Sequence, residues 1–277
     1  ITEYVFLKQK TKNNIRERIM AIHKLEHGHT IEFNEEKHVY IHNNDYVVGM
    51  STLLGKLASP ALENWKISQQ VNAIKTEMEH QGIPIDQIQK IVTNAKANAR
   101  KSGDNILNIG SMVHKFCEMW LKGEKFTDPS DPVILSCFEK FKRFWTKHKL
   151  KVVESEKVLY SERGFCGTLD LIAKDSQNNL WLIDIKTSKG LFLNMVHQLH
   201  GYKLAYEEQT GKKINKMYIV RLPKDSGDFE ARHILYKKEH LKAFLGLLHC
   251  HKSELMFNES VRKYNQLKKG NKNVSKN

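Results

Sequence analysis

The pattern of apolar and polar positions changes its period near residue 150. Before that point apolar residues mostly recur every three or four positions, the spacing of amphipathic helices, with breaks rich in Pro, Gly and Asp. After it, apolar and polar residues alternate over short runs, as in β-strands. We therefore predict a helical N-terminal half, then a mixed central sheet flanked by helices, an α/β or α+β fold.

The pattern assigns most of the chain to individual elements. The predicted helices are residues 3–27, 61–80, 86–101, 106–122, 133–149, 193–210 and 238–269. The predicted strands are residues 29–33, 37–42, 45–51, 151–161, 166–174, 179–187, 215–223 and 229–237. The last ten residues are polar and basic, and we expect them to be disordered.

The composition points to an anionic partner. The formal net charge is +14, which favours nucleic acid, although a solvated lysine-rich surface would give the same excess. The four cysteines form no CxxC pair, which argues against a zinc ribbon or a disulfide framework and favours free thiols in a reducing intracellular compartment. This is the cytoplasm or nucleoid, or a mitochondrion if a targeting segment was removed. No apolar run reaches ~18 residues, so we expect no membrane span.

Three charged residues interrupt two apolar strands in the segment GTLDLIAKDSQNNLWLIDIKTSKG, residues 167–190. If the hairpin turn is centred on Gln177, then Asp170 lies opposite Asp184, with Cβ atoms ~5 Å apart. Lys186 shares a strand face with Asp184. Because two opposed carboxylates repel each other, a divalent cation between them is a natural solution. The alternative is a surface-facing hairpin with a Lys–Asp salt bridge, against which the flanking LWLI run argues.

The order of motifs around this hairpin resembles the PD-(D/E)XK nuclease superfamily, in particular its RecB-like exonuclease branch. The motifs are GTLDLI followed by LIDIKTS, GSMVHKFCE (110–118) upstream, QLHGY (198–202) downstream, and a lead-in from Asp45 to Trp65. Phage-type enzymes and the mitochondrial genome maintenance exonucleases share this order. The resemblance runs from about residue 38 to residue 236 and implies a PD-(D/E)XK nuclease core.

The resemblance also implies roles for individual residues. His114 on the upstream helix, Asp170, Asp184 and the carbonyl of Ile185 would bind metal, and Lys186 would orient the attacking water. Asp170, Asp184 and Lys186 would form the catalytic set.

Further residues are assigned to the edge of the site. Glu156 would support the catalytic acids, although Glu154 lies on the same predicted strand face and is an open alternative. Gln198 and Tyr202, one helical turn apart, would contact the DNA backbone or brace the catalytic lysine, and ordinary helix packing is an alternative for Tyr202. Thr187 and Ser188 would bind phosphate, unless their polarity only reflects a loop.

The resemblance implies a metal-dependent DNA exonuclease that acts from a free DNA end. We expect one or two Mg²⁺ or Mn²⁺ ions, DNA that is single-stranded or has single-stranded ends, no membrane partner, and protein partners in replication, recombination or repair. The alternatives are a structure-specific endonuclease and a catalytically silent DNA-binding subunit. Only one cysteine, Cys250, lies beyond residue 236, where the resemblance ends, so no iron–sulfur cluster is expected. No phosphate-binding GxxxxGK[ST] loop is present, so no use of ATP is expected.

We divide the chain into three regions. They are a DNA-guiding, mostly helical region with a short β segment (1–104), the nuclease core (105–267) and a basic tail (268–277).

Overall fold

The structure of the chain is a computed structural model that describes most of its residues. It covers residues 2–11, 14–34, 37–57, 66–74, 76, 108–224 and 227–274, with only the backbone described for residues 2–20 and 267–274. The predicted helix 86–101 and parts of the predicted helix 61–80 lie outside the described residues. Residues 66–74 are helical, as predicted.

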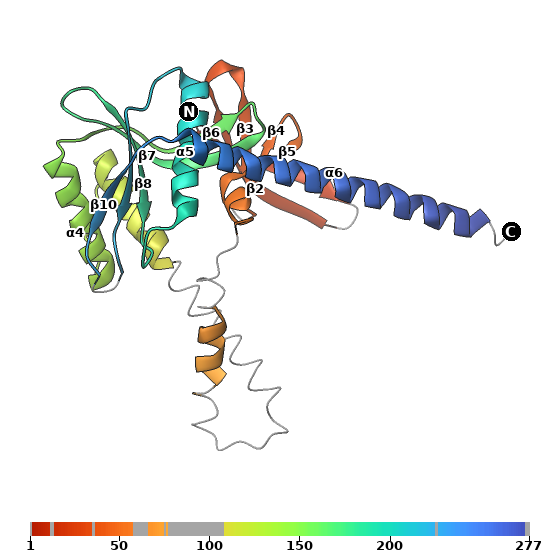
Figure 1. Cartoon of the computed structure of the whole chain (residues 1–277), viewed down its shortest axis with the longest axis horizontal. Coiled ribbons are helices and arrows are strands. Elements are labelled where there is room, and N and C mark those ends of the chain that lie inside the picture. The colour runs from red at the N-terminus through yellow and green to blue at the C-terminus, as the bar shows by residue number, and fades with distance from the viewer. Residues whose placement is uncertain are drawn as a thin grey trace.

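Ten described strands form one mixed sheet (Figure 1). They are β1 (Thr2–Thr11), β2 (Asn14–Lys24), β3 (Thr30–Asn34), β4 (Val39–His42), β5 (Asp45–Gly49), β6 (Lys151–Ser161), β7 (Phe165–Lys174), β8 (Leu180–Lys186), β9 (Lys216–Arg221) and β10 (Glu230–Ile234). The order is β1-β2-β3-β4-β5-β7-β8-β9-β10, with β6 paired to β7. β5–β7 and β8–β9 are parallel pairs and the others are antiparallel. The predicted mixed sheet is confirmed.

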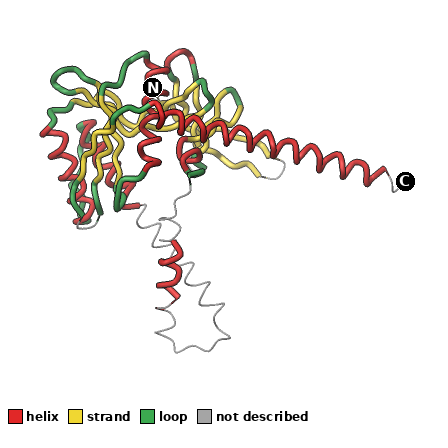
Figure 2. Tube along the Cα trace, viewed as in Figure 1, coloured by secondary structure: helices red, strands yellow, loops and turns green. Residues whose placement is uncertain are grey.

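Helices cover the sheet on two sides (Figure 2). They are α1 (Met50–Leu54), a helix at residues 108–122, α4 (Pro132–Lys147), α5 (Leu193–Thr210) and α6 (Lys238–Val274), with a short 3-10 turn η1 (Glu26–Gly28). Leu182 packs in one core cluster with α1, α5 and the start of α6, while Trp181 and Ile183 pack with helix 108–122 and α4. This alternation along β8 is typical of a strand covered on both faces, and it confirms the predicted α/β fold.

The N-terminal region differs from the prediction. Residues 3–27, predicted as one basic helix, form the hairpin β1–β2 and the turn η1. Ile15, Ile19 and Ile22 have helical spacing in the sequence. Pairing of β2 with β1 and β3 decides the backbone instead, because tertiary context overrides local propensity. The mostly helical description of residues 1–104 is therefore wrong for the part before residue 50.

The C-terminal prediction also needs correction. Helix α6 continues to Val274, so residues 268–274 are helical, although we predicted a disordered tail from residue 268. An existing helix propagates readily into a lysine-rich segment, because nucleation has already occurred. In Figure 1 the distal part of α6 extends away from the body of the protein. No helix among the described residues combines the length and apolarity needed to cross a membrane.

Candidate metal centre

The β7–β8 hairpin has the register that the sequence predicted. Leu171 pairs with Ile183 and Lys174 pairs with Leu180, so the hairpin is centred on Gln177. Continuing this register by one residue places Asp170 opposite Asp184.

The turn of this hairpin is fixed by Asp175. Its carboxylate accepts hydrogen bonds from the backbone N–H groups of Gln177 (3.0 Å) and Asn179 (2.9 Å), and from the indole N–H of Trp181 (2.9 Å). Lys216 on β9 donates to the same group at 3.1 Å. Asp175, which directly follows β7, therefore ties the turn to β8 and to β9.

Asp184 and Lys186 form an ion pair in which the aspartate is buried and the lysine is partly exposed. The Asp184 side chain is 1% exposed, and the Lys186 Nζ donates to Asp184 Oδ1 at 2.9 Å and lies 2.7 Å from Oδ2. Burial raises the pKa of Asp184, the Lys186 ammonium opposes this rise and the Asp170 charge adds to it. Burial would lower the pKa of Lys186, but Asp184 and Asp170 outweigh it, so the ammonium keeps its proton.

His114, Glu156 and Asp170 converge on one point. One potential ligand atom from each lies within 4.8 Å of the others. The His114 Nδ1 is 3.7 Å from Asp170 Oδ2, and that oxygen also accepts the backbone N–H of Ile185 at 2.7 Å. Ligands around one small divalent ion stand this far apart, and imidazole and carboxylate are suitable donors. These three side chains therefore fit a metal ion.

The backbone of β6 explains why Glu156 rather than Glu154 lies here. The only register shift between β6 and β7 lies before both residues, between Val152 and Glu154, but Glu156 itself has a positive φ of 47°, which is rare for a non-glycine residue. The two-residue alternation therefore breaks. The Glu154 carboxylate instead accepts from Lys157 at 3.1 Å.

The environment of Glu156 is strongly anionic. Although the residue is partly exposed, desolvation of its carboxyl, with the nearby charges of Asp170 and Glu118, raises its pKa. The Lys122 ammonium opposes the rise and pairs with Glu118 at 2.5 Å. The sequence analysis did not predict the Glu118–Lys122 ion pair. Opposite charges four residues apart on a helix are a pattern from which such a pair can be predicted.

The helix at residues 108–122 brings His114 to the sheet through a close approach. A Cβ atom on Gly110 would lie 3.0 Å from Thr187 Oγ1 and 3.9 Å from Lys224 Nζ. Gly110 is one turn before His114 on the same helix face. Lys224 lies in the loop after β9, where no sequence motif drew attention to it.

The remaining predicted residues surround this centre at different depths. Tyr202 is buried, and its hydroxyl donates to the Thr168 carbonyl at 2.7 Å and accepts from Gln198 at 3.3 Å. Burial raises the pKa of Tyr202, so the hydroxyl keeps its proton. Tyr202 thus braces β7 two residues before Asp170. Ser188 Oγ donates to the Gly190 carbonyl at 2.7 Å. The DNA contacts of these residues and the metal ligation by the Ile185 carbonyl stay predictions.

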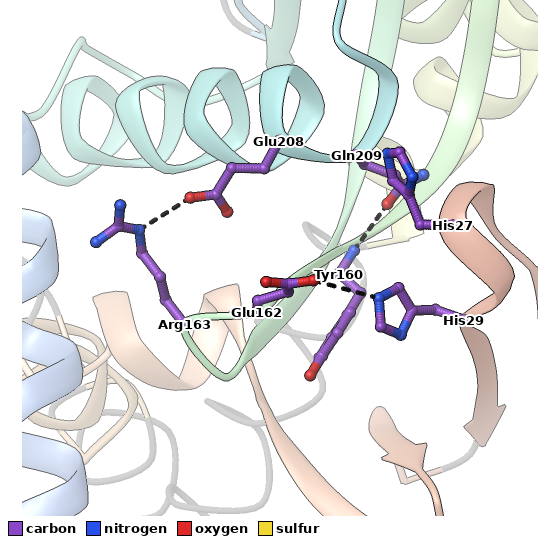
Figure 3. A pocket seen from close by; sticks show the side chains of 7 residues that line it. All are labelled: His27, His29, Tyr160, Glu162, Arg163, Glu208 and Gln209. Carbon is purple, nitrogen blue, oxygen red and sulfur yellow. Dashed lines mark hydrogen bonds and ion pairs between the residues drawn. The ribbon is translucent and has the colours of Figure 1, made fainter.

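A pocket of about 440 Å³ lies at the other end of the β6–β7 hairpin (Figure 3). Its lining residues are His27, His29, Tyr160, Glu162, Arg163, Glu208 and Gln209. Figure 3 shows their polar groups engaged with one another: Arg163 donates to Glu208 at 2.9 Å, Gln209 accepts from the Tyr160 backbone at 3.1 Å, and Glu162 lies 3.8 Å from His29. The potential metal ligands His114, Glu156 and Asp170 are not among the residues that line this pocket.

Comparisons with known proteins add little to this geometry. No protein-family model matches the chain, and no curated protein sequence matches it. The crystal structure of SSO0001 has 17% identity and a TM-score of 0.29 over 43% of this chain and 59% of that chain. The crystal structure of a "putative exonuclease" from Eubacterium rectale has 12% identity and a TM-score of 0.36 over 53% of this chain and 66% of that chain. Both matches span less than two thirds of the other protein, and at such scores neither decides a function.

Proposed function

We propose that this protein is a metal-dependent DNA exonuclease, which hydrolyses phosphodiester bonds from a free DNA end. The observation that carries the proposal is the convergence of the His114, Glu156 and Asp170 ligand atoms beside the Asp184–Lys186 ion pair. A structural salt bridge would not need a histidine and two further acids around it. The resemblance of the motif order to RecB-like exonucleases supports the same reading and favours a free end as substrate.

The residues have separable tasks in this proposal. His114, Asp170 and Glu156 would hold a Mg²⁺ or Mn²⁺ ion, and Asp184 is the acid next to this set. When bound, such an ion supplies an acidified water and neutralises charge on the phosphate. The Lys186 ammonium, fixed by Asp184, offsets the negative charge that develops on the attacked phosphate. Asp170 is itself oriented by the Ile185 N–H, which holds one of its oxygens in place.

The substrate and context form part of the proposal. The net charge of +14 supports a polyanionic partner, and a nuclease of this kind serves DNA replication, recombination or repair. A structure-specific endonuclease and a silent DNA-binding subunit are the competing functions.

The decisive experiment is digestion of end-labelled single- and double-stranded DNA with Mg²⁺ or Mn²⁺, with EDTA as the control. Asp184→Asn keeps the shape of the side chain but removes its charge, so cleavage should be lost while DNA binding is kept. Asp228→Asn, a change of the same kind at an exposed loop residue, should cleave normally. Near-normal cleavage by folded Asp184→Asn protein would refute the assignment. Cleavage of circular single-stranded DNA would indicate an endonuclease, and binding without cleavage would indicate a silent subunit.

A further inference from the structure

The segment that follows strand β8 leads from Lys186 of the candidate site to the start of helix α5. It comprises residues 187–192, and its last residue, Phe192, directly precedes the helix. Phe192 is 45% exposed, and the next residue, Leu193, is 58% exposed. Single exposed apolar residues are common on protein surfaces. The surroundings of this exposed pair therefore decide whether it can bind a ligand.

Hydrogen bonds and packing fix the path of this segment. The Ser188 hydroxyl donates to the Gly190 carbonyl at 2.7 Å, and the Arg221 guanidinium donates to the Lys189 carbonyl at 3.5 Å. Leu191 is partly buried and packs against the core cluster around α5. Leu191 therefore anchors the segment just before the exposed pair.

The Phe192 ring has a defined position on this segment. A Cβ atom on Gly190 would lie 3.8 Å from the Cζ atom of Phe192, which is ordinary van der Waals contact. The Phe192 carbonyl accepts the backbone N–H of Met195 at 3.0 Å. The tip of the ring thus lies close to Gly190, while almost half of the residue is exposed. A ring held in this way loses little conformational entropy when a flat ligand stacks on it.

The segment is too short to carry Phe192 far from the candidate metal centre. Phe192 is the sixth residue after Lys186, and six extended residues span at most about 20 Å. Stacked nucleotides follow one another at ~3.4 Å along a strand, so this reach corresponds to about six nucleotides at most. A strand with a phosphate at the metal centre can therefore have one of its bases at Phe192.

The charges along this part of the chain favour an anionic strand. Between Asp184 and Glu207 the sequence contains three lysines and neither aspartate nor glutamate. Lys189 is exposed and lies three residues before Phe192. Proteins bind single strands with cations for the phosphates and aromatic rings for the bases. Lys189 and Phe192 together supply both kinds of group.

We propose that Phe192 stacks on a base of the bound DNA strand, a few nucleotides from the phosphate that is cleaved, and so positions that strand at the metal centre. The proposal rests on the proposed nuclease function for its ligand. It adds a contact to a base, whereas the metal ligands and Lys186 act on a phosphate. Because every base has a π-face, the contact does not depend on the base sequence.

The first test measures binding of metal-free protein to a fluorescent single-stranded oligonucleotide, so it does not require cleavage. Phe192→Ala should weaken binding about tenfold, because a base–aromatic stack is lost. The slope of log K against log salt should stay unchanged, because no phosphate contact is removed. The matched control is Phe257→Ala, which removes a 67% exposed phenylalanine from the distal part of α6, and it should change the affinity much less.

Two further substitutions separate stacking from simple apolar contact. Phe192→Trp keeps a flat aromatic face and should bind at least as well as wild type. Phe192→Leu keeps apolar area but removes the ring, and it should bind almost as weakly as Phe192→Ala. Because Phe192 is exposed, all three variants should fold as the wild type does, which circular dichroism checks.

Oligonucleotides with a single abasic site locate the contact along the strand. For wild-type protein, an abasic site at one position should reduce affinity about tenfold. Phe192→Ala should lose nothing further at that position, whereas Phe257→Ala should show the full loss. A fluorescent aminopurine base placed there should be quenched on binding to wild type and much less on binding to Phe192→Ala. With metal present, Phe192→Ala should raise KM with little change in kcat.

The two proposals fail in different ways. Equal affinity of wild type and Phe192→Ala, or of wild type and Phe192→Leu, would overturn the stacking contact even if the wild type cleaves DNA. The contact would also be overturned if every abasic position weakened binding equally in wild type and Phe192→Ala. A position-specific stack on Phe192 in a protein that never cleaves DNA would support the contact and overturn the nuclease assignment.

Discussion

Removing the Asp175 carboxylate should destabilise the protein, because this one group holds the turn between the two strands of the candidate site. In Asp175→Ala the buried Trp181 indole N–H loses its acceptor, which costs about 1–3 kcal/mol. The N–H groups of Gln177 and Asn179 can find water, so each contributes only about 0.5 kcal/mol. The partly exposed Lys216 pair adds about 0.5 kcal/mol. We expect a loss of about 3 kcal/mol in the free energy of unfolding.

The loss should depend on pH in a defined direction. Burial alone would raise the pKa of Asp175, but hydrogen bonds from Asn179, Trp181 and Lys216 outweigh it and hold the pKa well below the ordinary value of 3.8. A carboxyl whose folded pKa is depressed stabilises the protein above its unfolded pKa, and this stabilisation is lost as the pH falls towards the folded value. The difference between wild type and Asp175→Ala should therefore be full at pH 7 and shrink below about pH 4.

Urea denaturation followed by tryptophan fluorescence, at pH 7 and at several acidic values, measures both effects. Asp228→Ala, at an exposed loop residue, is the matched control and should stay within about 0.5 kcal/mol of wild type. A loss below about 1 kcal/mol at pH 7, or a difference that does not shrink in acid, would refute the assigned role of Asp175.

Further variants test the metal centre and the packing around it. His114→Ala should weaken Mn²⁺ binding in calorimetry by about tenfold or more, with activity partly rescued by excess Mn²⁺; an unchanged titration would assign His114 to packing. Gly201→Ala should destabilise the protein by about 1–2 kcal/mol, because its Cβ would lie 2.8 Å from atoms of Met50 and Phe244. Gly246→Ala, where a Cβ meets nothing within 4 Å, makes the same change in a helix and should stabilise by up to about 1 kcal/mol. Thermal melts of the two glycine variants should thus shift in opposite directions, and equal shifts would contradict the packing described for α5.

Local patterns were sufficient to predict the β7–β8 hairpin of the candidate site. Asp170, Asp184 and Lys186 stand out because a charge inside an apolar strand is rare, and the polar turn centred on Gln177 fixes which acids face each other. The predicted bounds of helix α5 agree with the observed ones. The helix ends at Gly211, which has the left-handed conformation, and glycine is the residue that most often ends a helix in this way.

Features set by long-range contacts could not be predicted in this way. A strict two-residue alternation places Glu154 and Glu156 on one face, and only the positive φ of Glu156 separates them. The β1–β2 hairpin replaces the predicted helix because of strand pairing that no local window contains. Lys224 reaches the helix at residues 108–122 from a loop more than 100 residues away, and its place depends on the whole sheet.

The distribution of the cysteines makes selective chemical labelling possible. Cys117, Cys137 and Cys166 are buried, and burial raises the pKa of each thiol, which keeps them protonated and poorly nucleophilic. Cys250 is exposed on α6, close to Lys252, whose ammonium donates to the Arg163 carbonyl at 2.8 Å and so anchors the helix to the body. A maleimide dye should therefore attach at Cys250 without any cysteine being removed. A fluorophore at that position, paired with one on a DNA end, would test by energy transfer whether the proposed DNA substrate binds and where its end lies relative to α6.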